Sequence, residues 1–167
     1  WKEYWAFWCD KAQPDYRKKT GKRVFGTGFP MGVDSSDSYY SFLTFMDAYN
    51  VKLVDDNGKV TVADPKVRQG LIGALRDYTM PYIKGCTPPS STSWKDPDNN
   101  VAFHNKTAVM THNATISIAA KWLDDANNAS NTPEQRAQGK KAYEELIATS
   151  GFPNKPDGSK MVYRAAV

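Results

Sequence analysis

Apolar side chains recur along the first twenty residues at steps of three and four. The set that follows this spacing is Trp1, Tyr4, Trp5, Trp8 and Ala12. Such spacing gathers the side chains on one face of a helix, which is expected over residues 1–19 and to end at Thr20 and Gly21. A broad aromatic face of this kind requires a large surface to cover it.

A short apolar run, VFGTGF at residues 24–29, follows this helix. It is typical of a strand in which Gly26 and Gly28 mark a bend or a close backbone approach. The loop after it is rich in residues that cap helices, so the next helix should begin between Ser36 and Ser38. The expected apolar face of that helix consists of Tyr39, Phe42, Phe45, Met46 and Tyr49.

Turn residues divide the next part of the chain. Asn50 is expected to adopt a left-handed conformation at the end of the preceding helix, and Asn57 with Gly58 predicts a hairpin of two short strands. Asp64 is the expected N-cap of a helix over residues 65–78, because proline at its first position favours a helix start. The inner face of this helix is predicted to consist of Leu71, Leu75 and Tyr78.

The second half of the chain begins with residues 85–97, GCTPPSSTSWKDP, which predict a long irregular loop. A short helix DNNVAF, a strand KTAVMT and a helix that begins at Asn113 should follow. Thr132 should cap a polar helix over residues 133–150, and MVYRAAV should form a final strand. Alternating strands and helices predict an α/β domain, with a small sheet flanked by several helices, over residues 1–167.

Composition limits the classes of function. With 167 residues and 40% hydrophobic content, the chain can form one domain with its own core. Its apolar runs are far shorter than the roughly 20 residues of a membrane helix. The net charge is +4, and the densest basic group, residues 17–23, fits a solvated helix end better than a nucleic-acid patch. Cys9 and Cys86 form either a disulfide or two thiols, and their spacing does not decide between these.

The sequence does not indicate catalytic chemistry. His104 and His112 flank one short strand, which separates them by well over about 20 Å and prevents a shared metal. Each is expected at the surface or in a supporting position. The glycine-rich GTGFPMG matches no nucleotide-binding motif, and Asp34 with Asp37 fits the ordinary preference of carboxylates for helix starts. We therefore expect a protein that is not an enzyme and uses no cofactor and no metal.

A set of binding residues remains. Trp94 lies in the Pro- and Ser-rich loop, and Asp96, Asn99 and Asn100 follow it closely. Aromatic rings stack on the apolar side of sugar rings, while Asn and Asp side chains form hydrogen bonds with hydroxyl groups. This combination suits a sugar or a polyol. The alternative is that Trp94 anchors the long loop to the domain.

Three segments occur in a familiar order: VDDNGKVTVADPKVRQGLIGALRDY, then TPPSSTSWKDPDNNVAFHNKTAVMTHNATISI, then GFPNKPDGSKMVY. Together they resemble the family 1 extracellular solute-binding proteins of ABC sugar importers, most specifically in W-x-D-x-x-N-N-x-A-F. The resemblance implies one lobe of a type II periplasmic-binding-protein fold, excised from a two-lobe protein in which both lobes close on a ligand. The span resembles the second lobe.

The resemblance also implies which residues bind the ligand. Asp37 and Tyr39 match an acidic residue and a ring-stacking aromatic at the start of a cleft helix, and Asn113 matches a polar group after a strand. Where many sugar binders carry an aromatic, this chain has Ile116, and Trp94 is expected to compensate. The predicted ligand-binding residues are Asp37, Tyr39, Trp94, Asn99, Asn100 and Asn113.

The implied function is that of a substrate-binding component of an ABC transporter. It would bind a sugar or related polar solute in the cleft, close by hinge bending, and deliver the solute to the membrane subunits of the permease. We expect a monomer with no nucleic-acid partner, exported to the periplasm or the cell exterior, either free or as a membrane-anchored lipoprotein. The alternative function is a stand-alone carbohydrate-binding module or an accessory domain of a hydrolase.

Overall fold

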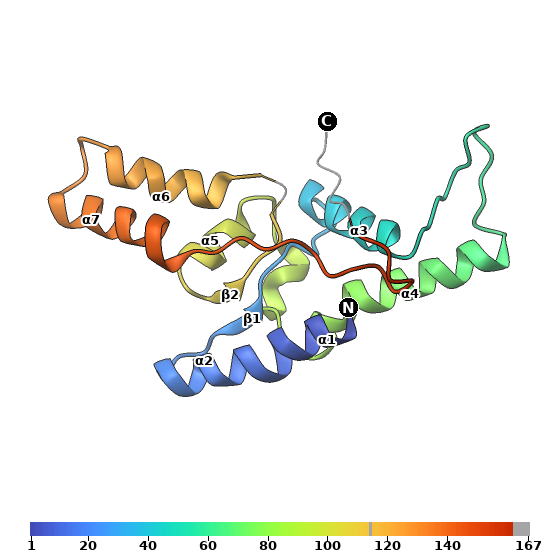
Figure 1. Cartoon of the computed structure of the whole chain (residues 1–167), viewed down its shortest axis with the longest axis horizontal. Coiled ribbons are helices and arrows are strands. Elements are labelled where there is room, and N and C mark those ends of the chain that lie inside the picture. The colour runs from blue at the N-terminus through green and yellow to red at the C-terminus, as the bar shows by residue number, and fades with distance from the viewer. Residues whose placement is uncertain (114, 162–167) are drawn as a thin grey trace. The chain divides into compact units, whose positions relative to one another are not determined.

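The computed structural model describes residues 1–113 and 115–161 (Figure 1). These residues form two compact units within the span predicted as one domain. The first unit contains residues 1–113 and 152–161, and the second contains residues 115–151. In the described part of the chain, no helix is long and apolar enough to cross a membrane.

The first unit begins with one continuous helix. It consists of α1 (Lys2–Trp5), the π-helical η1 (Ala6–Ala12) and α2 (Gln13–Thr20). The left-handed Gly21, with φ of 67°, ends it, which confirms the predicted helix and its terminus. Trp5, Cys9 and Gln13 are buried along this helix. These three residues are spaced four apart, which places them on one face of the helix.

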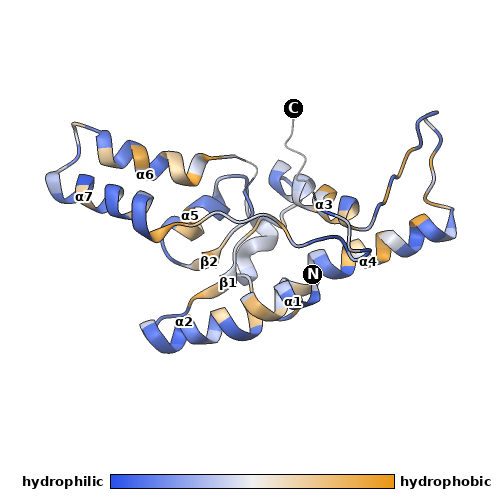
Figure 2. Ribbon diagram, in the orientation of Figure 1, coloured by the Kyte–Doolittle hydropathy of each residue, from blue (hydrophilic) through white to orange (hydrophobic). Residues whose placement is uncertain are grey.

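Two strands form the small sheet of the first unit. β1 (Phe25–Thr27) runs parallel to β2 (Ala108–Met110), with Phe25 paired to Ala108 and Thr27 to Met110. Both strands were predicted, and the mixed α/β character of the fold is confirmed. Figure 2 shows apolar residues in both strands and mainly polar residues in α2. The predicted final strand lies outside the described residues beyond Met161.

Helices α3 (Ser36–Ala48) and α4 (Pro65–Ile83) pack against each other. Asn50 is left-handed at the end of α3, as predicted. Gly58 is also left-handed in a turn closed by a single antiparallel bridge between Val54 and Val60, so the hairpin is shorter than expected.

Helix α4 differs from its prediction in two ways. It continues beyond residue 78 and through Pro81, as far as Ile83. Its buried side also differs, because Leu75 is 45% exposed whereas Gly73, Ala74 and Asp77 are buried. Leu75 was therefore wrongly assigned to the inner face. Gly73 has no space for a larger side chain, because the ring of Tyr49, the C-cap of α3, lies against it.

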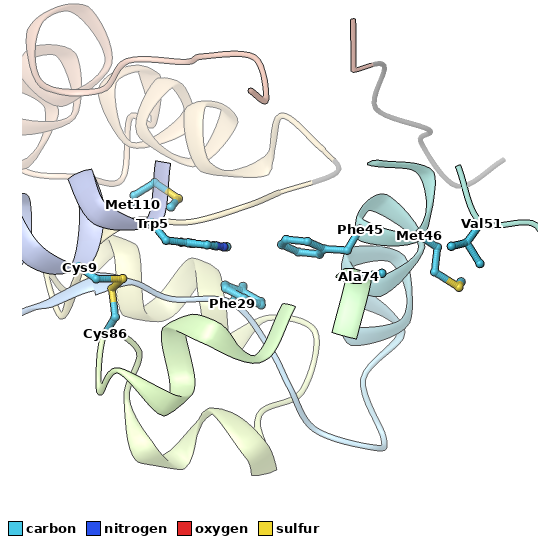
Figure 3. Close-up of a cluster of buried hydrophobic side chains, with 9 residues drawn as sticks. All are labelled: Trp5, Cys9, Phe29, Phe45, Met46, Val51, Ala74, Cys86 and Met110. Atoms are coloured by element: carbon cyan, nitrogen blue, oxygen red, sulfur yellow. A yellow bond between two sulfur atoms is a disulfide. The ribbon is translucent and has the colours of Figure 1, made fainter. Parts of the chain in front are cut away.

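The core of the first unit is largely aromatic. Trp5, Phe29 and Phe45 are at most 1% exposed (Figure 3), and the Trp5 ring stacks on both phenylalanine rings at centroid distances of 6.1 Å. The N-terminal helix therefore covers its aromatic face with residues that follow β1 and with α3, as its sequence pattern required. Burial of such large rings is a main source of stability in a small domain.

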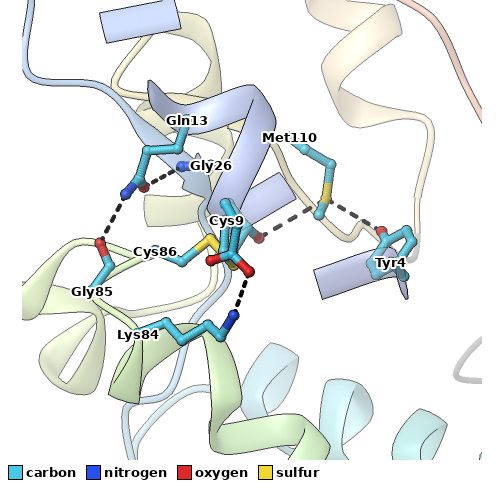
Figure 4. The surroundings of a disulfide bond; sticks show 10 residues. Tyr4, Cys9, Gln13, Gly26, Lys84, Gly85, Cys86 and Met110 are labelled. Atoms are coloured by element: carbon cyan, nitrogen blue, oxygen red, sulfur yellow. Dashed lines mark hydrogen bonds and ion pairs between the residues drawn. A yellow bond between two sulfur atoms is a disulfide. The ribbon is translucent and has the colours of Figure 1, made fainter. Parts of the chain in front are cut away.

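A disulfide joins the N-terminal helix to the segment after α4. It links Cys9 with Cys86, 77 residues apart in sequence (Figure 4). Beside it, Gln13 accepts a hydrogen bond from the Gly26 backbone N–H at 2.7 Å and donates one to the Gly85 carbonyl at 3.3 Å. The structure thus resolves the alternative left open by the sequence, and this corner of the unit is held both covalently and by polar contacts.

The second unit is a helical hairpin formed by α6 (Ser117–Asn127), α7 (Pro133–Lys141) and the π-helical η3 (Ala142–Leu146). Thr132 caps α7 in a capping box with Gln135, as predicted at this terminus. The first helix begins at Ser117 rather than at Asn113, and the last ends at residue 146 rather than 150. These two boundaries were predicted incorrectly.

Candidate functional site

Three of the predicted ligand-binding residues, Asp37, Tyr39 and Asn113, come after one of the two parallel strands in the chain. After β1 the chain reaches Ser35, the N-cap of α3, so Asp37 and Tyr39 are the second and fourth residues of that helix. After β2 it reaches Asn113 within three residues. Ligands of open α/β domains bind in the region outside the carboxyl ends of strands. This region is therefore the candidate site.

Asp96 connects the loop after η2 (Pro89–Ser93) to the start of α3. Its carboxylate accepts hydrogen bonds from Ser36 Oγ at 2.6 Å, from Ser35 Oγ at 2.7 Å and from the Asp37 backbone N–H at 3.0 Å. These three donors lower the pKa of Asp96 to about 2. Asp96 is therefore a charged anchor that supplements the Ser35 cap, and its oxygens are already occupied.

Asp37 and Tyr39 differ in exposure. Asp37 is half-buried, and its pKa is raised by burial and by the negative charge of Asp96. Tyr39 is 59% exposed, and its ring centroid lies 5.6 Å from that of Tyr40. Its assignment to the buried face of α3 is therefore wrong. An exposed ring beside a carboxyl group in one helical turn remains compatible with the predicted binding role.

Trp94 makes the contacts of an anchor. Its indole N–H donates to Ser90 Oγ at 3.1 Å. Its backbone carbonyl lies so close to Gly32 that a Cβ on this glycine would be 2.3 Å from the carbonyl oxygen. Its ring covers Gly28, where an added Cβ would lie 3.5 Å from two ring atoms. The half-buried ring thus fastens the loop against the end of β1, in keeping with the anchoring alternative.

Helix α5 (Asp98–His104) brings three asparagines together with the end of β2. Asn99 is fully buried and donates to the His112 carbonyl at 3.1 Å, while its own side-chain oxygen accepts from the Asn100 backbone N–H at 2.9 Å. Asn113 donates to the side-chain oxygen of Asn100 at 2.5 Å. Asn100 and Asn113 are half-buried. Because Asn99 has no exposed surface, its prediction as a residue that contacts ligand is corrected to a positioning role.

His112 was missed as a buried residue, having been expected at the surface or in a supporting position. Its ring is stacked on Phe29 at 5.4 Å, and its Nε2 lies 3.0 Å from the Tyr4 hydroxyl. Burial lowers the pKa of His112 to about 4. His112 lies two residues after an apolar strand, and because side chains alternate in an extended chain it points away from the side of Thr111. This alternation was the signal in the sequence for its burial.

Within residues 1–113 and 115–161, no group of three or more His, Cys, Asp or Glu side chains is arranged to hold a metal ion. The arrangement around α3 and α5 instead offers hydrogen-bonding groups and one exposed aromatic ring. Such groups can form hydrogen bonds with a polar molecule and stack on its apolar face.

No family model matches the chain, and comparisons with curated proteins and with solved structures give no significant match. The family resemblance accordingly stays an expectation based on sequence motifs.

Proposed function

We propose that this chain is one lobe of an extracellular solute-binding protein that binds a sugar or related polar solute and delivers it to the permease of an ABC importer. The observation that supports the proposal is that β1 and β2 are parallel, with the start of α3 following β1 and Asn113 following β2. The motif from Trp94 to Asn100 supports both groups, because Asp96 holds the start of α3 and Asn99 holds the end of β2.

The roles follow from exposure and hydrogen-bonding capacity. Tyr39 stacks on the apolar face of a sugar ring, and Asn100 and Asn113 bind hydroxyl groups through the donors and acceptors of their amides. Asp37 accepts hydrogen bonds from adjacent hydroxyls. Asn99 and Trp94 keep these elements in place. Binding shifts a hinge equilibrium towards a closed form recognised by the permease, without catalysis, cofactor or metal.

The disulfide supports the proposed location. Cys9 and Cys86 are the only cysteines of the chain, and they are paired. Disulfides persist in the periplasm and outside the cell, whereas cytosolic thiols are kept reduced. An exported protein, free or lipid-anchored, accounts for this pairing.

Calorimetric titration with a panel of sugars and polyols tests the proposal. In the two-lobe protein that contains this chain, Tyr39→Ala and Asn113→Ala should each weaken binding by about 1 to 3 kcal/mol. Tyr16→Ala is the matched control, because Tyr16 is 46% exposed on α2. Unchanged affinity in both test variants would rule out this site.

A second titration separates the two proposed classes of protein. A single lobe supplies only half of a cleft, so this chain by itself should bind the same solute much more weakly than the two-lobe protein does. A carbohydrate-binding module would retain full affinity in the isolated chain. That outcome would replace the transport proposal with the module.

A further inference from the structure

A cavity of about 560 Å³ lies in the first unit at the end of α3 opposite to Asp37 and Tyr39. Its walls come from the N-terminal helix, the end of α3, helix α4 and the segment around Pro156. None of the six predicted ligand-binding residues lines it. Its volume falls in the range of small-molecule pockets, so it is a separate place to look for a ligand.

The polar wall of this cavity is fixed by a hydrogen-bonded group on α3 and α4. The Tyr49 hydroxyl donates to the buried Asp77 carboxylate, and Arg76 donates to the same hydroxyl at 3.0 Å. Arg76 Nε also lies 3.4 Å from Asp77. The Asp77 charge is therefore compensated within the protein, and the guanidinium group of Arg76 is held in position.

The opposite wall is also built from internal contacts. Asn50 donates to the Asp157 carboxylate at 2.7 Å and accepts from Lys155 Nζ at 2.7 Å. These two bonds fix the turn that carries Pro156 next to the end of α3. The turn that borders the cavity is therefore held by contacts within the protein.

Donors outnumber acceptors around the cavity. Trp1, Trp5 and Met80 give it an apolar part. Lys2, Arg76 and Lys84 add three cations, whereas Asp77 is the one carboxylate among the lining residues.

The three cations of the cavity differ in whether they form an ion pair. Lys84 is paired with Asp10 at 2.5 Å, outside the lining residues (Figure 4). Lys2 has no ion pair in the part of the chain that the structure describes. Arg76 is paired with Asp77, so Lys2 supplies the excess positive charge of the wall, beside the tryptophan rings and Met80.

We propose that this cavity binds a small organic anion with an aromatic body. The anionic group is held by Lys2 and Arg76, and the aromatic body lies against Trp1, Trp5 and Met80. Carboxylate and sulfonate groups carry the charge and the acceptors that this wall lacks. The site is independent of the proposed sugar site at the other end of α3.

A pair of fluorescent probes tests this proposal. The anion 8-anilinonaphthalene-1-sulfonate carries a charged group, and N-phenyl-1-naphthylamine has the same ring system without it. The sulfonate should bind the chain at least about tenfold more tightly than the neutral amine does. Phenylacetate should displace the sulfonate, whereas the neutral phenylethanol should not. Equal affinity for the two probes would overturn the proposal.

Matched variants locate the bound anion. Lys2→Gln with Arg76→Gln should weaken binding of the sulfonate by about tenfold and leave that of the amine unchanged. Lys66→Gln with Arg68→Gln removes the same charge from an exposed part of α4 outside the cavity and should have little effect at 0.15 M salt. Equal losses in the two double variants would show that net charge alone attracts the probe. If thermal melting shows that the first variant is unfolded, Lys2→Gln alone gives the same comparison with Lys66→Gln.

Discussion

Acidification should destabilise the first unit through His112. The imidazole is buried among aromatic rings, and burial lowers its pKa from 6.5 to about 4. The folded state therefore binds a proton more weakly than the unfolded state, so stability rises with pH. The stabilisation is fully present above pH 6.5 and is lost as the pH falls towards 4. The difference between the two pKa values corresponds to about 3 kcal/mol, of which about 2 kcal/mol is lost between pH 7 and pH 5.

Urea unfolding followed by tryptophan fluorescence at pH 7 and pH 5 measures this loss. His112→Gln removes the titrating group while keeping a polar partner for Tyr4, so the free energy of unfolding should change much less between the two pH values. His104→Gln removes the other of the two histidines in the chain and should leave the loss unchanged. If His112→Gln retains the loss of about 2 kcal/mol, burial of this imidazole is not its cause.

Two further predictions concern the packing of α4 and the disulfide. Gly73→Ala would place a Cβ 2.4 Å from the Tyr49 ring, so we expect it to lower the free energy of unfolding by about 1 to 3 kcal/mol. Gly58→Ala is a poor control, because Gly58 is left-handed. Ala137→Gly, at an exposed position of α7, measures the effect of helix propensity alone. A change below about 0.5 kcal/mol in Gly73→Ala would contradict the close approach of α3 and α4. Replacing Cys9 and Cys86 by serine opens a loop closed across 77 residues and should cost up to about 4 kcal/mol in the same assay. Equal stability with and without reductant in the native chain would show that the two thiols are not bridged.

Local signals in the sequence predicted three of the helix termini correctly. Gly21, Asp64 and Thr132 lie where the structure has a left-handed terminus and two N-caps. These features depend on the conformation of a few neighbouring residues and on side-chain bonds to adjacent backbone groups. The strands β1 and β2 were also predicted, from the short runs VFGTGF and KTAVMT that contain them.

Features that depend on distant contacts were not predictable in the same way. Asn99 was expected to face a ligand because of its residue type, but the carbonyl of His112 takes its amide inside the protein. The extension of α4 through Pro81 overrides the usual limit that proline sets within a helix. The disulfide was left open because spacing in sequence does not give a distance in space.

The candidate site was only partly predictable, because some of its contacts also join residues that are distant in the sequence. Sequence order placed Asp37 and Tyr39 at a helix start and Asn113 after a strand, and the structure agrees with these positions. It did not reveal that Asp96 bonds to Ser35 and Ser36, because the partners are about sixty residues apart.

The π-helical stretch η1 makes the length of the N-terminal helix a constraint on folding. Upstream of it, Trp5 enters the core, and downstream, Gln13 reaches Gly26 and Gly85. Each residue of an α-helix turns the chain by about 100°, so the number of residues between Trp5 and Gln13 sets the angle between the directions in which they point. Removal or addition of one residue between Ala6 and Ala12 would therefore put the two ends of the helix out of phase, and either the aromatic core or the clamp beside the disulfide would be lost.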